Sequence, residues 1–105
     1  MPIPLSTRSA QVASALFNEP ERTRIIERLV AEASENIPFH DDATPETIDR
    51  IRFAIMKLIS RSRKNEEPAF ELAKGDWRDL YVWAGFANSA TEHENWCDRM
   101  LEKYG

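Results

Sequence analysis

Two groups of residues could support metal or acid–base chemistry. His93 and Cys97 are four positions apart, so on a helix both side chains point the same way and could reach one metal ion. The only other histidine, His40, could join them in a composite zinc site with Asp41. Zinc requires three or four ligands in good geometry, and nothing in the spacing joins the two groups. A histidine at the edge of the core, whose second ring nitrogen bonds a carbonyl, is therefore the favoured interpretation of His93.

The same residues could also act in catalysis. His40 could be a base oriented by Asp41 or Asp42, with His93 as a second titratable group. Adjacent residues rarely face each other, and acidic loops before helices are common for local reasons. The sequence contains no glycine-rich phosphate loop and no nucleophile elbow. We therefore lean against an enzyme and assign no catalytic residue, cofactor or metal ligand.

Four cations recur along one face of the expected third helix. They are Arg50, Lys57, Arg61 and Lys64. Helical periodicity places this basic stripe roughly opposite a stripe of isoleucines. It could bind an acidic partner or phosphates, but a solvated face is the more common reason for such a run.

Aromatic residues concentrate in the last third of the chain. The set is Trp77, Tyr81, Trp83, Phe86 and Trp96. Most of these rings must form core, but one small helical domain has limited room for them. Trp83 and Phe86 are the best candidates for the surface, where exposed aromatics mark interfaces. This favours contact with another protein or self-association, for example as a homodimer.

A helix-turn-helix pattern also ends the chain, with its turn at residues 84–86. DNA-binding versions place the second helix in the major groove. Here that helix carries Glu92, Glu94 and Asp98, whose charge would repel phosphates. The formal net charge of the chain is −4. Nucleic-acid or phosphate binding, through this helix or through the basic stripe, is therefore the less favoured alternative.

The elements that position these residues are predicted from breakers and periodicity. Residues 1–8 include an extended or disordered lead, and Ser6 or Ser9 caps a first helix that reaches about residue 18. A second helix starts at Pro20 and stops near residue 36, with Arg28 and Glu32 as an exposed pair.

The third helix has the strongest pattern. Thr44 is its expected N-cap, and the helix runs from Pro45 to about Arg63. Its expected buried face is Ile48, Ile51, Ile55, Leu58 and Ile59.

Three further helices are expected after a break at residues 65–68. A short helix from Pro68 to Lys74 would end at Gly75 in a left-handed cap, and a continuous helix through Gly75 is the alternative. Asp76 then caps a helix over residues 77–84, and Gly85 is its exit. A capping box at residues 91–94 begins the last helix, which reaches about residue 104.

Composition agrees with one all-α domain over residues 1–105, a compact bundle of five or six helices with short loops. The chain has 42% apolar and 30% charged residues, three glycines and one cysteine. No stretch is long and apolar enough for a membrane span, and we expect a cytoplasmic protein. Our leading hypothesis is a non-enzymatic domain that works by protein–protein contact, and the alternative is an enzyme based on His40, Asp41 and His93.

Overall fold

The computed structural model describes residues 4–33, 45–86 and 91–104. In these residues the chain is all-α, as predicted. The helices are α1 (Thr7–Leu16), α2 (Glu21–Glu32), α3 (Pro45–Arg61), α4 (Glu66–Lys74), α5 (Trp77–Ala84) and α6 (Glu92–Tyr104), with a 3-10 turn η2 (Arg63–Asn65) after α3. None of the described helices combines the length and apolar composition that a membrane span requires.

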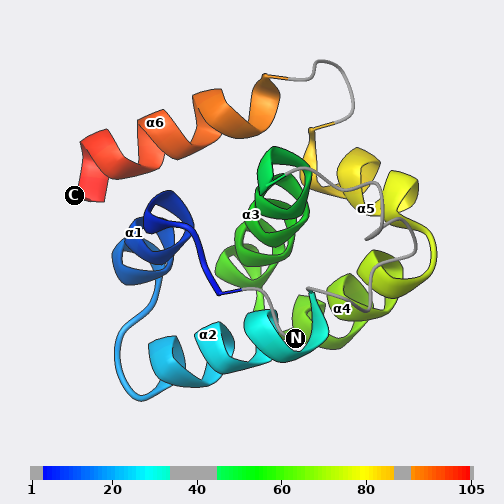
Figure 1. The fold of residues 1–105 in the computed structure, drawn as a ribbon, viewed down its shortest axis with the longest axis horizontal. Coiled ribbons are helices and arrows are strands. Elements are labelled where there is room, and N and C mark those ends of the chain that lie inside the picture. Colours follow the sequence, from blue (N-terminus) through cyan, green and yellow to red (C-terminus); the bar gives the residue numbers. More distant parts are fainter. Residues whose placement is uncertain (1–3, 34–44, 87–90, 105) are drawn as a thin grey trace.

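Helix α3 lies at the centre, and the other helices surround it (Figure 1). All five residues of the predicted buried face are buried. Burial also extends to the opposite side, because six consecutive residues, 51–56, are buried. A helix buried around most of its circumference needs neighbours on every side, and α1, α4, α5 and α6 supply them.

Local signals set most of the helix boundaries. The Ser6 hydroxyl accepts from the N–H of Ser9 at 3.0 Å, and the Asp76 carboxylate accepts from Asp79 at 3.4 Å. Gly85 ends α5 with a φ of 81°, in the left-handed region that favours glycine. Gly75 is different: its φ is −118°, and the predicted left-handed cap there is wrong. Its N–H instead donates to the carbonyls of Glu71 and Leu72, which ends α4 without a positive φ.

Other boundaries differ from prediction by a few residues. Helix α4 begins at Glu66, two residues before the predicted start at Pro68. Pro68 is the third residue of the helix, where a backbone N–H has no intrahelical acceptor and none is lost. Helices α1 and α3 each end about two residues early, and α2 ends at Glu32. The predicted N-cap Thr44 lies outside the described residues.

Arg52 is a buried cation that the sequence did not reveal. Only 1% of this residue is exposed. Its Nε donates to the carbonyl of Ala33 at 3.0 Å, and its Nη1 donates to the carbonyl of Pro4 at 3.0 Å. Arg52 therefore ties the end of α2 and the chain before α1 to the central helix.

Candidate interaction surface

The predicted basic stripe lies on the side of α3 that α5 covers, where Arg50 and Lys57 are half-buried and Arg61 is exposed. The guanidinium of Arg50 stacks on the Tyr81 ring, 4.2 Å from its centroid. It also donates a hydrogen bond to the carbonyl of Phe86. Arg61 donates to the carbonyl of Trp83 at 3.4 Å. The expected solvated face is wrong for Arg50 and Lys57, because α5 packs on that side of α3, whereas Arg61 is exposed as expected. Carbonyls at the C-terminal end of α5 accept from Arg50 and Arg61.

Lys64 does not belong to this row. It lies in η2, beyond the last residue of α3, and its side chain is exposed. Arg63, its neighbour, pairs with Glu21 of α2 at 2.7 Å. The stripe therefore contains three cations on α3 in place of the predicted four.

Lys57 lies in the middle of the stripe and is half-buried. Its Nζ is 4.8 Å from the centroid of the Phe86 ring and 6.0 Å from that of Trp96. Within the described residues, this ammonium has these ring contacts but no hydrogen bond or ion pair. Burial lowers the pKa of Lys57, and the charges of Arg61 and Arg99 lower it further. We call Lys57, Arg61 and Arg99 the cationic cluster.

Two apolar side chains of α5 are exposed beside the cationic cluster. Val82 is 66% exposed and Trp83 is 37% exposed, and they are the large hydrophobic residues that the described part of the chain leaves at its surface. Arg61 donates to the backbone of Trp83, and a Cβ placed on Gly85 would be 3.5 Å from Lys57 Nζ. The C-terminal end of the helix that carries Val82 and Trp83 therefore lies beside Arg61 and Lys57. We call Val82, Trp83 and the cationic cluster together the α5 surface.

Phe86 does not join this surface, so its predicted exposure is wrong. The ring is 1% exposed, with its centroid 5.9 Å from the ring of Trp96 and 6.2 Å from that of His93. The left-handed turn at Gly85 redirects the chain, and the next side chain enters the core between α3 and α6. Trp83, one helical turn earlier, remains outside.

A second set of cations lies between α2 and α4, and it is fully paired. We call this the ion-pair cluster, and its members are Arg24, Arg28, Glu32, Glu66, Glu67 and Lys74. Glu66 accepts from Arg24 at 2.7 Å and from Arg28 at 2.6 Å. Arg28 also reaches Glu67 and the predicted partner Glu32, both at 2.6 Å. Hydrogen bonds from Arg24 and Arg28 lower the pKa of Glu66 to about 2, against the opposing effect of burial.

His93 is a core residue, as its favoured interpretation predicts. It is 7% exposed and stacks on Phe53 with 6.0 Å between ring centroids. Its buried Nδ1 has no hydrogen-bond partner in the described part of the chain, so the carbonyl expected there is not found. Burial lowers the pKa of His93, and the charge of Arg50 adds to this effect. The ring is thereby kept neutral near pH 7.

A metal site at His93 receives no support from the described residues. They contain no group of three or more His, Cys, Asp or Glu side chains that could hold an ion. Cys97 is buried in α6, and burial raises the pKa of its thiol to about 12. His40 and Asp41 lie outside the described residues, so the composite site and the catalytic alternative stay predictions.

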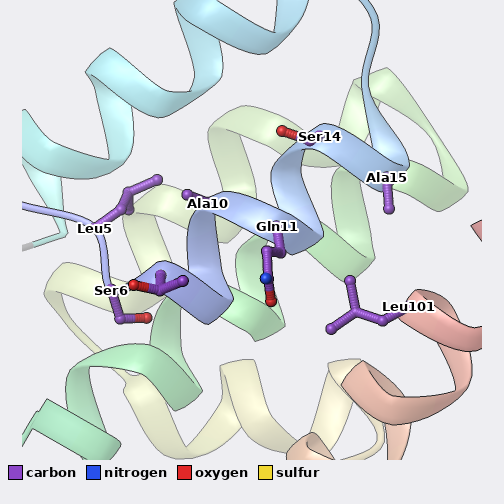
Figure 2. A pocket seen from close by; sticks show the side chains of 8 residues that line it. Leu5, Ser6, Ala10, Gln11, Ser14, Ala15 and Leu101 are labelled. Carbon is purple, nitrogen blue, oxygen red and sulfur yellow. The ribbon is translucent and has the colours of Figure 1, made fainter. Parts of the chain in front are cut away.

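An open groove of about 790 Å³ runs along the outer side of α1. Figure 2 shows Leu5 at one side of it, α1 along its length and Leu101 of α6 across from Ala15. Its polar groups are hydroxyls and one amide, and no ionisable side chain lines it. The groove therefore offers shape but no group for acid–base or ionic chemistry.

We compared the chain with protein-family models, with curated proteins and with solved structures, and none of the three gave a match. The candidate surface is therefore inferred from the geometry of this chain alone. Two of its residues were missed from the sequence. Val82 could have been found, because it lies outside the apolar stripe of its helix. Arg99 could not, because its relevance depends on α6 lying near Lys57.

Proposed function

We propose that this chain works by contact with another protein, or with a second copy of itself, through the α5 surface. The observation that carries the proposal is the exposure of Val82 and Trp83 on a helix whose other face, Leu80 and Tyr81, is buried in the core. Tryptophan is among the residues that contribute most to protein interfaces, because its large ring is buried at little entropic cost.

The apolar pair alone would give only a weak contact. The exposed parts of both side chains amount to roughly 200 Å², and burying them would give about 4–5 kcal/mol. That corresponds to a dissociation constant in the millimolar range even before the costs of association. A functional interface here needs a second contribution, and the adjacent Lys57, Arg61 and Arg99 can supply it.

Substitution at Trp83 tests the proposal. We would compare wild type with Trp83→Ala by analytical ultracentrifugation over a range of concentrations, and by retention of proteins from an extract of the source cells. We expect wild type to self-associate or to retain a protein. We expect Trp83→Ala to lose this contact while its melting temperature falls by only about 4–8 °C, the shift that corresponds to a loss of about 1 kcal/mol. Leu101→Ala is the matched control, because Leu101 is a half-buried apolar residue on a different surface.

Three results would count against the proposal. Wild type could be a monomer that retains nothing. Leu101→Ala could lose the same contact as Trp83→Ala, which would point to the α1 groove or to a general effect. Trp83→Ala could unfold the chain, in which case Trp83 contributes mainly to the core.

A further inference from the structure

The cationic cluster holds positive charge that the described part of the chain does not balance. Among the described residues Lys57, Arg61 and Arg99 have no carboxylate within ion-pair distance. Arg61 donates to one carbonyl at the end of α5, and Glu92 acts on Lys57 from a greater distance. A helix end carries about half an elementary charge, so this end and the single carboxylate of Glu92 do not balance three cations.

This imbalance is local, because the chain as a whole is rich in carboxylates. It has 18 Asp and Glu residues against 14 Lys and Arg. The ion-pair cluster shows that acidic side chains do approach cations closely elsewhere on the molecule. At the cationic cluster they do not, and the like charges of Arg61 and Arg99 bear on Lys57. A carboxylate brought from outside would meet these cations without having to break an internal ion pair.

We propose that the α5 surface recognises an acidic segment of another protein, which places two or more carboxylates beside an apolar or aromatic side chain. This inference rests on the proposed function. The apolar side chain would pack on Val82 and Trp83, and the carboxylates would pair with Arg61, Arg99 and Lys57. A hydrogen bond from the half-buried Lys57 to a carboxylate is charge-assisted, so it would orient the bound segment as well as attract it.

An acidic protein segment fits better than nucleic acid. Phosphate backbones are bound by many cations in a row, whereas this surface has three, and Glu92 and Glu94 follow at the start of α6. The apolar pair Val82 and Trp83 also suits a side chain better than a charged backbone. A second copy of the chain is the competing protein partner, and the experiment separates it.

The test is selection of random-sequence peptides on the immobilised full chain, followed by affinity measurements. We expect the selected peptides to carry excess Asp and Glu together with an apolar residue, and their affinity to fall as salt is added. Arg61→Gln/Arg99→Gln should weaken their binding by at least about tenfold. The matched control is Arg24→Gln/Arg63→Gln, which removes the same charge from two exposed arginines that have carboxylate partners. We expect it to bind as wild type does.

The outcomes separate this inference from the proposed function. The proposal of an acidic segment would be overturned by selected peptides that are neutral or basic, by equal binding of the two double variants, or by failure to select any peptide. If ultracentrifugation shows a dimer that Trp83→Ala dissociates and Arg61→Gln/Arg99→Gln does not, the proposed function stands and the acidic segment falls. Binding of a single-stranded oligonucleotide that exceeds peptide binding, and that Arg61→Gln/Arg99→Gln abolishes, would replace the protein partner with nucleic acid.

Discussion

The two groups of cations in this molecule differ in the partners that their charges have. In the ion-pair cluster, Arg28 alone reaches three carboxylates within 2.6 Å. In the cationic cluster, Lys57 faces aromatic rings and Arg61 faces a backbone carbonyl. The first group joins α2 to α4 and satisfies its own charge. The second joins α3 to the end of α5 and keeps much of its charge available to another molecule.

The difference shows that a count of charged residues says little about what they do. An ion pair closed within the chain stabilises one arrangement of helices, and opening it would leave a poorly solvated charge. Cations that face carbonyls and rings hold helices together while their electrostatic attraction for anions remains. We therefore expect substitutions in the ion-pair cluster to change mainly the free energy of unfolding, and substitutions in the cationic cluster to change mainly binding.

The largest effect should come from removing the buried ring of Phe86, which Lys57 of the cationic cluster contacts. Phe86→Ala removes a 1% exposed side chain that contacts Lys57, His93 and Trp96. We expect the free energy of unfolding, measured with urea, to fall by about 3–5 kcal/mol, because a cavity remains. Trp83→Ala, three positions earlier, should cost about 1 kcal/mol. Equal losses for the two variants would mean that Phe86 is not core.

The next largest effect is the dependence of stability on pH that the ion-pair cluster produces. Folding lowers the pKa of Glu66 from the ordinary 4.5 to about 2. Between these values the unfolded chain binds the proton first, so this stabilisation is complete above pH 4.5 and disappears as pH falls toward 2. The shift corresponds to about 3 kcal/mol, which screening by solvent reduces to about 2 kcal/mol.

Comparison with Glu66→Gln isolates this contribution. Urea unfolding at several pH values should show the variant about 2 kcal/mol less stable at pH 7 and equal to wild type near pH 2. Glu71→Gln is the control, since Glu71 is 73% exposed and its ion pair with Lys74, the one it makes with the described residues, is 3.8 Å long. A difference between wild type and Glu66→Gln that does not change with pH would refute the assignment to this carboxylate.

A smaller effect distinguishes the lysines of the two groups. Lys74→Met removes a pair with Glu32 at 3.1 Å, in which both side chains are about one-third exposed, and should cost about 0.5 kcal/mol. Lys57→Met removes a half-buried ammonium that has no acceptor among the described residues, and repulsion from Arg61 and Arg99 ends with it. The lost ring contacts and this relief should nearly cancel, so we expect wild-type stability or slightly more. A loss larger than that of Lys74→Met would show that Lys57 is mainly a structural residue.

The parts of the fold that depend on residues close in sequence were predictable. Asp76 and Gly85 bound α5 as their chemistry indicates, because a carboxylate that accepts a backbone N–H and a glycine with positive φ act within one turn. The isoleucine face of α3 follows from helical periodicity in the same way. The start of α4 was predicted wrongly at Pro68, because the sequence does not distinguish a proline at the third helical position from one at the first.

The candidate site was only partly predictable, because it depends on contacts between distant elements. A basic stripe looks the same in sequence whether it faces water or the carbonyls at the end of another helix. Arg50 and Lys57 were predicted to face solvent for this reason, although Arg50 packs on Tyr81 of α5 and Lys57 on the rings of Phe86 and Trp96. Phe86 and Trp83 have similar local context, and only the turn between them sends one inward. Arg99 enters the site through the packing of α6, which no local pattern encodes.

The last prediction tests whether the cationic cluster acts as one electrostatic unit. The pKa of Lys57 is lowered first by burial and then by Arg61 and Arg99. In Arg61→Gln/Arg99→Gln the pKa of Lys57, followed by nuclear magnetic resonance of its side chain, should rise but stay below the ordinary value, because burial persists. Arg24→Gln/Arg63→Gln should leave it unchanged. If the first double variant also leaves it unchanged, the three cations do not share a field, and the attraction for an acidic segment would have to come from Arg61 or Arg99 singly.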